Sequence, residues 1–488
     1  MRNEVQLIAY ADRFGGTLRG LVELLDGPLA GLFGGVHVLP FFVQYDGADA
    51  GYDPVDHLRV DRRLGGWEDL RVLGRGRDTV VDLIVNHVSA ATAEFREVVE
   101  HGDAAPHAGM FLTFGSVFPG GATEEDLARI IRPRPGLPFT PMVLGGRHRL
   151  VWTTFTARQV DIDVHHPESR AYLSAILRRF ADSGATMVRL DAIGYAVKTP
   201  GSSCFLTPET DEFVDRLTAE AHALGLGVLT EVHAPHRYAV ELADRVDRVY
   251  DFALAPLILR ALLAGDDAPL RRWLATRPHN AVTVLETHDG IAMVDAGPDF
   301  FTDGRSVLLS AGDLFDLATR ISRNSDGTAV NVETPSGGLY RVDCTIYDAL
   351  ARDDRRYLLA RLIQFLTPGI PQVYYVGLLA GLNTDPPTDA DSREINRRRY
   401  TEAQVHQALR QPVVQALLRL IRFRNAHPAF AGEFTLPDSP PGRLEMSWRA
   451  GADRVHLAAD LADADYTLTF TADGTDHTLT DVAALPTA

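Results

Sequence analysis

The sequence predicts an α/β protein built on a closed (β/α)8 TIM barrel, with two insertions on its catalytic face and a small all-β domain at its C-terminal end. Two observations predict this fold. Eight short runs rich in β-branched residues alternate with amphipathic helical segments, which is the pattern of a parallel barrel. No G-x-G-x-x-G motif follows the first run, and this disfavours the rival arrangement, an open doubly wound sheet.

Each predicted strand is a short apolar run bounded by polar or turn-forming residues. Between the strands, ESRAYLSAILRRFADSG (168–184) places five apolar side chains on one helical face. Another helical segment, TPETDEFVDRLTAEAHALG (207–225), begins with Thr207 as the predicted N-cap and Pro208 in the first turn. The eight predicted strands are VQLIAYA (5–11), GVHVLPF (35–41), TVVDLIVNH (79–87), TMVRLDAIGY (186–195), GVLTEVH (227–233), RVYDFAL (248–254), AVTVLETHD (281–289) and IPQVYYVG (370–377).

Two segments are too long to be single crossover helices. The first separates the third and fourth strands, and the second follows the seventh strand and is rich in Gly, Ser, Asp and Asn. Insertions at the carboxyl ends of barrel strands lie on the catalytic face. After LIRFRNAHPAF the helical periodicity stops and short alternating runs predict a β domain. The predicted units are barrel residues 1–87, an insertion domain 88–167, barrel residues 168–290, an insertion 291–350, barrel residues 351–432 and a β domain 433–488.

Charge and composition limit the classes of partner. The formal net charge of −17 argues against nucleic acid or an anionic membrane, whereas a small neutral substrate is compatible with it. The two cysteines, Cys204 and Cys344, cannot build a disulfide framework and fit a reducing compartment. No signal peptide is readable, and the longest apolar run is broken by Arg260. We therefore expect a cytoplasmic protein.

Ionisable residues recur at or just after the ends of predicted strands. Any one of them has an ordinary interpretation as a helix cap, a turn former or a structural histidine. Six at equivalent positions of one repeat favour an active site, because barrel strand ends converge on one pocket. These residues are Asp49, His87, Asp191, Glu231, His288 and Asp289.

Arg189 and Asp191 lie two residues apart in one predicted strand, so their side chains point to the same face. A strand interior does not accept two ionised groups unless they face each other or a polar cavity. Three carboxylates in one pocket suit the cleavage of a glycosidic bond with retention, which needs a nucleophile and an acid/base. Arg189 would keep Asp191 ionised as the nucleophile, while neighbouring carboxylates would keep another carboxyl protonated.

Four short motifs resemble the regions that define the α-amylase superfamily: DLIVNH, VRLDAIGY, LTEVH and LETHDG. Further blocks across the barrel and both insertions are similar to the sucrose phosphorylase group. They are GADAGYDPVDH, GATEEDLARIIRPRPGLPF, VWTTFTARQVDID, DRVYDFAL, PHNAVTVLETHDGI and PGIPQVYYVG.

The resemblance implies a role for each matching residue. Asp191 would be the nucleophile, Glu231 the acid/base and Asp289 the stabiliser of an oxocarbenium-like transition state. Asp49 and an arginine of REINR, taken as Arg397, would close the pocket on the sugar 4-hydroxyl. The other implied substrate-binding residues are Tyr52, His87, Gln159, Arg189, Tyr195, His233 and His288, and the implied phosphate and acceptor loops carry Arg134, Tyr340 and Arg341.

The implied reaction converts sucrose and phosphate to α-D-glucose 1-phosphate and D-fructose through a covalent glucosyl-enzyme. The resemblance to this group, whose phosphorylases look like metal-free enzymes, implies that the protein needs no metal and no organic cofactor. The expected partners are small molecules only, with no nucleic acid or membrane, and a homodimer is plausible for the group.

One segment, SGGLYRVD, departs from the group and leaves the acceptor open. Gly338 and Arg341 stand where an aspartate and a glutamine are expected, and Ile131 replaces an expected tyrosine. Loss of a negative group and gain of a positive one would suit an anionic acceptor, as in a sucrose 6′-phosphate or glucosylglycerate phosphorylase. The alternative is that Arg341 points to solvent or pairs with Asp343 or another local carboxylate. An α-glucoside hydrolase is a further rival, whereas an inactive scaffold is disfavoured because all three carboxylates are present.

Overall fold

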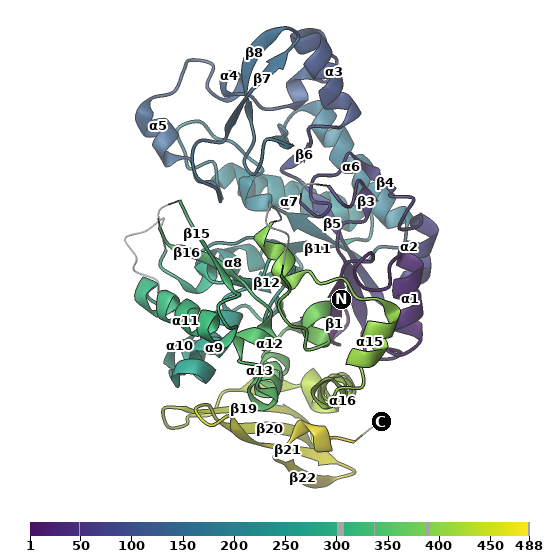
Figure 1. The fold of residues 1–488 in the computed structure, drawn as a ribbon, viewed down its shortest axis with the longest axis vertical. Coiled ribbons are helices and arrows are strands. Elements are labelled where there is room, and N and C mark those ends of the chain that lie inside the picture. Colours follow the sequence, from purple (N-terminus) through teal and green to yellow (C-terminus); the bar gives the residue numbers. More distant parts are fainter. Residues whose placement is uncertain (48, 300–306, 336, 386–390, 487–488) are drawn as a thin grey trace.

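The computed structural model describes residues 1–47, 49–299, 307–335, 337–385 and 391–486. Eight parallel strands close into a barrel, which confirms the predicted fold class (Figure 1). Around the barrel the strands are β1 (Gln6–Ala9), β2 (Gly35–Val38), β5 (Asp78–Ile84), β10 (Met187–Asp191), β11 (Gly227–Thr230), β12 (Arg248–Asp251), β13 (Ala281–Thr283) and β17 (Ile370–Tyr374).

All eight barrel strands fall within or overlap the predicted runs, but several end earlier. The run 281–289, for example, forms a strand only over Ala281–Thr283. The chain then leaves the hydrogen-bond ladder and turns across the rim of the barrel, so the polar residues at the ends of the runs lie in loops. These loops, and not the strands themselves, carry most of the candidate site.

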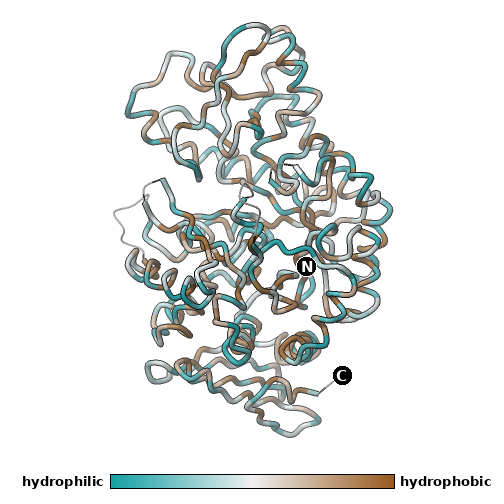
Figure 2. Tube along the Cα trace, viewed as in Figure 1, coloured by the Kyte–Doolittle hydropathy of each residue, from teal (hydrophilic) through white to brown (hydrophobic). Residues whose placement is uncertain are grey.

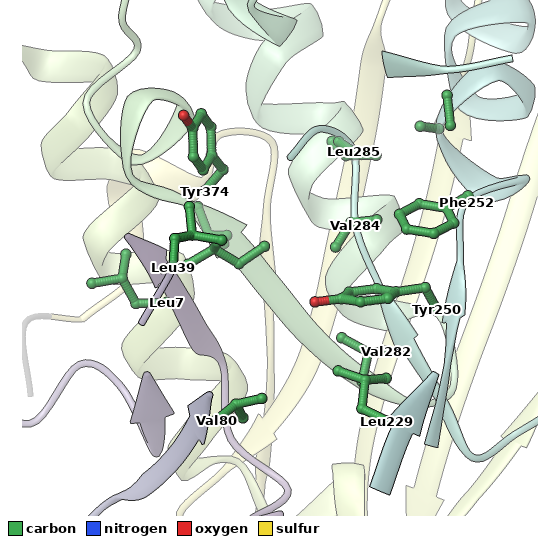
Figure 3. Close-up of a cluster of buried hydrophobic side chains, with 14 of the residues drawn as sticks. Leu7, Leu39, Val80, Leu229, Tyr250, Phe252, Val282, Val284, Leu285 and Tyr374 are labelled. Atoms are coloured by element: carbon green, nitrogen blue, oxygen red, sulfur yellow. The ribbon is translucent and has the colours of Figure 1, made fainter. Parts of the chain in front are cut away.

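The barrel interior combines an apolar core with a few polar side chains. Leu7, Val80, Leu229 and Val282 are fully buried and lie in one cluster (Figure 3). Burying an aliphatic side chain of this kind contributes about 1.5–3 kcal/mol. Hydrophobic residues are concentrated in the interior of the molecule, and hydrophilic ones recur along its outer helices and loops (Figure 2).

The helices surround the barrel as amphipathic elements. In α6 four of the five predicted apolar residues are buried, and Tyr172 is half-buried. Thr207 is the N-cap of α7, although its hydroxyl makes no capping hydrogen bond. The α-helices outside the first insertion are α1 (Leu18–Asp26), α2 (Trp67–Leu73), α6 (Pro167–Asp182), α7 (Pro208–Ala223), α8 (Arg237–Ala243), α9 (Leu254–Ala264), α10 (Ala268–Thr276), α11 (Ala311–Asn324), α12 (Ile346–Ala349), α13 (Asp354–Leu366), α14 (Tyr375–Leu378), α15 (Glu402–Ala408) and α16 (Pro412–Ala426).

The segment between β5 and β10 forms a small layer above the rim of the barrel (Figure 1). Its core is a cluster that includes Phe118 and Trp152. The elements are β6 (His87–Ser89), α3 (Ala93–His101), α4 (Phe114–Val117), α5 (Glu124–Arg129), β7 (Phe139–Leu144), β8 (Arg147–Trp152) and β9 (Gln159–Asp161).

The segment after β13 contains a three-stranded sheet in the order β14 (Ile291–Ala292), β16 (Leu339–Asp343) and β15 (Val330–Glu333), with α11 between β14 and β15. Residues 300–306 and Ser336 of this predicted insertion lie outside the described residues. A short hairpin of β3 (Phe42–Val43) and β4 (Asp56–Val60) follows β2.

The C-terminal segment is a five-stranded antiparallel sheet on the side of the barrel away from both insertions (Figure 1). This sheet contacts the helical layer of the barrel through Trp448, whose indole N–H donates to the carbonyl of Leu366 at the end of α13 at 2.7 Å. The strands are β18 (Glu433–Thr435), β19 (Arg443–Ala450), β20 (Asp453–Asp460), β21 (Asp465–Ala472) and β22 (Thr475–Leu479). Within the described ranges, no helix has the length and apolar character needed to cross a membrane.

Candidate active site

A pocket opens at the carboxyl ends of the barrel strands, between the two inserted segments. All the site residues predicted from the sequence border it except Arg189 and Arg397, which lie behind its wall. Phe155, Phe205 and Arg393 also border the pocket and were not singled out from the sequence. The predicted residues at its wall are Asp49, Tyr52, His87, Arg134, Gln159, Asp191, Tyr195, Glu231, His233, His288, Asp289, Tyr340 and Arg341.

Arg189 is the central cation beneath the pocket. It lies on β10 in register with Asp82 of β5, so both side chains point into the barrel. Its Nη1 donates to Asp82 Oδ1 at 2.5 Å and to Asp191 Oδ1 at 3.0 Å, and its Nη2 lies 3.8 Å from Glu231 Oε1. The predicted contact between Arg189 and Asp191 is present, but the guanidinium charge is divided among three carboxylates.

The two carboxyls above Arg189 differ in how strongly they hold a proton. Burial raises the pKa of Asp191 well above its ordinary value, and Arg189 does not outweigh this because Glu231 adds to the rise. Burial also opposes ionisation of Glu231, but Arg189 and His233 reverse the effect and lower the pKa of Glu231. Contact with Arg189 alone therefore does not make Asp191 the ionised member of the pair, because the same guanidinium also faces Glu231 and Asp82.

His233, in the loop after β11, contacts the Glu231 carboxylate. Its Nε2 lies 3.2 Å from Glu231 Oε1, and its Nδ1 lies 3.4 Å from Asp295 Oδ2. Although burial favours the neutral ring, hydrogen bonds to Asp295 and Glu231 raise the pKa of His233 to about 10. The imidazolium also stacks on Phe252 with ring centroids 4.2 Å apart. Asp295 lies in the second inserted segment, and no motif in the sequence marked it.

A pair of arginines holds Asp289. Arg393 Nη1 donates to Asp289 Oδ1 at 2.7 Å, and its Nη2 donates to Asp49 Oδ1. Arg397 Nη2 reaches the same Asp289 oxygen at 3.2 Å, while its Nε donates to the His288 carbonyl at 2.8 Å. Arg393 borders the pocket and contacts Asp49, whereas Arg397, the arginine of REINR that was expected at the closed end, lies behind the wall in this structure. Both arginines belong to REINR, and local sequence alone does not tell them apart.

These cations keep the carboxylates at this end of the pocket ionised. Burial by itself would raise the pKa of Asp289, but contacts with His288, Arg393 and Arg397 hold that pKa well below its usual range. The same two arginines lower the pKa of Asp49 against its burial. Burial in turn lowers the pKa of His288 to about 4, so its ring is neutral.

The remaining wall residues combine ring faces with hydrogen-bonding groups. The Tyr52 ring stacks on His288 at 5.0 Å with an interplanar angle of 6°. His87 Nε2 lies 2.8 Å from the Tyr52 carbonyl oxygen and 3.1 Å from Gln159 Nε2. Gln159 also donates to Asp49 Oδ2 at 3.4 Å. Polar edges and flat rings of this kind suit the hydroxyls and the apolar face of a sugar.

Two loops form the mouth of the pocket. Arg134 is exposed in the first loop and directs a cation toward the opening. In the second, Tyr340 and Arg341 border the pocket, and Arg341 Nε donates to Asp343 Oδ1 at 2.7 Å. The structure thus bears out the alternative in which Arg341 pairs with Asp343, although the guanidinium also stays at the pocket wall. Ile131 borders an apolar recess next to the pocket, together with Tyr195 and Tyr340.

Glu231, His233 and Asp289 offer three possible metal-ligand atoms within 4.8 Å of one another. In the described part of the chain they form the one group with this spacing. Each donor already has a partner, because Glu231 contacts His233, His233 contacts Asp295, and Asp289 contacts Arg393. Two arginines beside the group add positive charge, which disfavours a divalent cation there.

Comparison with known proteins places this fold and pocket in a family. Residues 8–254 match the alpha-amylase family, described as "Alpha amylase, catalytic domain". The chain is 48% identical over 476 residues to a sucrose phosphorylase of Agrobacterium vitis, covering 96% of this chain and 97% of that protein. It is 45% identical to a sucrose phosphorylase of Bifidobacterium adolescentis, covering 94% of this chain and 92% of that protein. The crystal structure of a sucrose 6F-phosphate phosphorylase from Thermoanaerobacter thermosaccharolyticum matches with a TM-score of 0.90 and 34% identity, covering 98% of this chain and 99% of that one.

The chain therefore belongs to the alpha-amylase family and, within it, to the sucrose phosphorylase group. The resemblance found in the sequence motifs is confirmed over nearly the whole chain.

Proposed function

We propose that this protein is a retaining glucoside phosphorylase that converts sucrose and phosphate to α-D-glucose 1-phosphate and D-fructose. The observation that carries the proposal is the placement of Asp191 and Glu231, at the carboxyl ends of neighbouring barrel strands and above one guanidinium, with the Asp289 carboxylate in the same pocket. The names of its two relatives at 48% and 45% identity support the choice of substrate.

In the first step, an Asp191 oxygen attacks the anomeric carbon of the glucosyl unit while the bond from that carbon to the fructosyl oxygen breaks. Glu231 gives its proton to the departing oxygen, so fructose leaves as a neutral alcohol. The productive arrangement needs the shared proton on Glu231 and the charge on Asp191. Arg189 contacts both carboxyls, so its guanidinium stabilises the negative charge on Asp191 when Glu231 carries the proton.

In the second step, a phosphate oxygen attacks the anomeric carbon and the ester bond to Asp191 breaks. Glu231 takes the proton of the attacking phosphate oxygen, which restores both carboxyls to their starting states. Two inversions at the same carbon give net retention, so the product is the α-anomer. Arg134 at the mouth can pair with the phosphate dianion, because an exposed guanidinium offers two parallel donors.

The ion pair between Arg393 and Asp49 gives the pocket a closed end. Both side chains are about nine-tenths buried, and the Asp289 carboxylate joins them on the same guanidinium. A closed end of this kind accepts one terminal glucosyl unit and leaves no room for a longer chain beyond it. The same groups can bind the 4-hydroxyl of that unit.

An anionic acceptor is the second candidate, and the position of Arg341 at the pocket wall favours it. Its contact with the Asp343 carboxylate offsets the added charge, so fructose remains the first choice. The test is an acceptor screen with α-glucose 1-phosphate as donor, in which phosphate release is followed with fructose, fructose 6-phosphate and glycerate. Fastest release with fructose supports the proposal, whereas faster release with a charged acceptor assigns the protein to the second candidate. Glucose formation that ignores the acceptor would make it a hydrolase.

A further inference from the structure

Asp295 is a buried carboxylate of the second inserted segment that the proposed reaction does not use. It lies in the short 3-10 helix η4 (Val294–Ala296), is 4% exposed, and does not border the active-site pocket. A buried charge is costly unless it is paired or hydrogen-bonded, so such a group calls for an explanation. Within the described part of the chain, its one ion-pair partner is His233 in the loop after β11.

The His233 ring lies between two carboxylates. Its Nδ1 is 3.4 Å from Asp295 Oδ2, and its Nε2 is 3.2 Å from Glu231 Oε1. Ionised carboxylate oxygens only accept hydrogen bonds, whereas a neutral imidazole has one donor and one acceptor nitrogen. A ring that faces an ionised carboxylate with each nitrogen satisfies both only when both nitrogens carry protons. The geometry therefore indicates an imidazolium, in agreement with the raised pKa of His233.

Asp295 also fixes the course of the loop that follows Glu231. The Ala234 N–H donates to Asp295 Oδ1 at 3.4 Å, and the His236 N–H donates to the Asp295 carbonyl at 3.0 Å. Burial raises the pKa of Asp295, while His233 and the Ala234 N–H oppose that rise because they stabilise the charged form. The side chain and the main chain of one residue thus act together on the position of His233.

The other groups around the His233 ring come from separate elements. Phe252, just after β12, stacks on the ring with centroids 4.2 Å apart, and the Tyr340 ring of β16 meets it edge-on at 5.8 Å. The Tyr340 phenol is neutral, because burial raises its pKa well above the ordinary value. Asp289 offers a carboxylate oxygen within 4.8 Å of a His233 nitrogen. Carboxylates and an aromatic face therefore favour a positive ring.

The acid/base is held by donors on both of its oxygens. Glu231 Oε2 receives the Ala192 N–H at 3.0 Å, and Oε1 faces His233. In the second step of the proposed reaction, Glu231 must be ionised while phosphate approaches the same pocket. Two anions at short range repel each other, and a fixed positive charge beside Glu231 offsets this repulsion.

We propose that Asp295 is a positioning residue that holds His233 as a two-donor imidazolium against Glu231, and so keeps a positive charge beside the acid/base while phosphate attacks. Asp295 touches neither substrate nor the reacting atoms and acts through His233. The kinetic part of this inference rests on the proposed function. The protonation of His233 is measured without substrate, so the inference and the proposed function can fail separately.

The first test follows the His233 ring in wild type and Asp295→Asn with no substrate present. Protein labelled with ¹³C at histidine Cε1 is titrated by NMR, and the His233 signal is the one missing in His233→Gln. The wild-type ring should stay charged far above the usual histidine range, since its pKa is about 10. In Asp295→Asn it should lose its proton at a lower pH, because one negative partner is gone. A wild-type ring that is neutral at neutral pH, or equal titrations, would overturn the inference.

The second test measures kcat/KM for phosphate with α-glucosyl fluoride as donor, across the neutral and alkaline range. Asp295→Asn keeps the imidazolium at low pH and loses it as pH rises through the lowered pKa of His233. The ratio of variant to wild type should therefore fall with pH by roughly tenfold, the size of one hydrogen bond to a charged group. Taking this ratio at each pH cancels the ionisation of phosphate itself. The value for the donor should change less, because fluoride leaves without a proton from Glu231.

Asp299→Asn is the matched control. Asp299 is 1% exposed in the same segment, and its carboxylate pairs with Arg237. The same change there should lower Tm but leave the ratio independent of pH. An equal fall in Asp299→Asn, or a flat ratio in Asp295→Asn, would overturn the positioning role. If Asp295→Asn does not fold, Asp295→Glu is titrated in the same way: a His233 ring that stays charged supports the inference, and a neutral ring overturns it.

Discussion

Arg393→Ala tests which arginine closes the pocket. Arg393 donates to Asp289 at 2.7 Å and to Asp49, and both carboxylates border the pocket. A hydrogen bond between charged groups contributes about 1.5–3 kcal/mol, so two such bonds correspond to roughly 100- to 10,000-fold in kcat/KM. Arg397 keeps its 3.2 Å contact with Asp289, which places the expected loss near the lower end, at about 100-fold.

The assay compares α-glucosyl fluoride with its 4-deoxy analogue in wild type and variant. If Arg393 and Asp49 bind the 4-hydroxyl, its removal should cost the wild type much more than it costs Arg393→Ala, with a difference of about tenfold or more. Arg397→Lys is the matched control, because it changes the neighbouring arginine behind the wall and should keep the full 4-hydroxyl penalty. An equal penalty in wild type and Arg393→Ala would refute the assignment of Arg393 to the closed end.

Three further predictions follow from the same geometry. Asp191→Ala should abolish turnover, and Glu231→Gln or Asp289→Asn should lower kcat by roughly 100-fold or more, as measured with sucrose and phosphate; activity near wild type in any of them would contradict its role. The pH profile of kcat/KM should be bell-shaped, since the active enzyme holds one proton on the pair of carboxyls Asp191 and Glu231. Because the pKa of Glu231 is lowered, the acid limb should fall below the ordinary glutamate range. Because the pKa of Asp191 is raised, the basic limb, where the pair loses its shared proton, should lie well above that range. A basic limb in the ordinary carboxylate range would argue against the shared proton. Arg341→Gln should lower the rate with fructose 6-phosphate relative to fructose by less than about tenfold, because Asp343 already neutralises Arg341. The measurement is the ratio of the two rates in wild type and variant. A larger fall in that ratio would mean that the guanidinium leaves Asp343 to bind the acceptor.

The Arg341 loop shows how far sequence reasoning reached in the candidate site. The substitution at this position was visible in SGGLYRVD, and so was Asp343 two residues away. Residues two apart on a strand share a face, so their pairing was one of two open outcomes. Only the structure shows that Arg341 and Asp343 meet at 2.7 Å while Arg341 stays at the pocket wall.

The surroundings of Asp191 show where local sequence reasoning stopped. The spacing of Arg189 and Asp191 correctly predicted their contact, but it could not reveal that Asp82 and Glu231 lie on the same guanidinium. A pKa depends on every charge within a few ångströms and on burial, and these come from strands far apart in the sequence. The choice between Arg393 and Arg397 has the same origin.

The sequence by itself determined the barrel, the order of its strands and the group of proteins to which the chain belongs. Hydrophobic periodicity and strand-end polar residues are local patterns, and a parallel barrel brings all strand ends to one rim, so the site could be located before any coordinates were known. Tertiary structure alone decided which arginine meets Asp49 and how one guanidinium is shared among three carboxylates. These features depend on distances between side chains from different strands and loops, where a shift of a few ångströms changes the partner, and no local pattern encodes such distances.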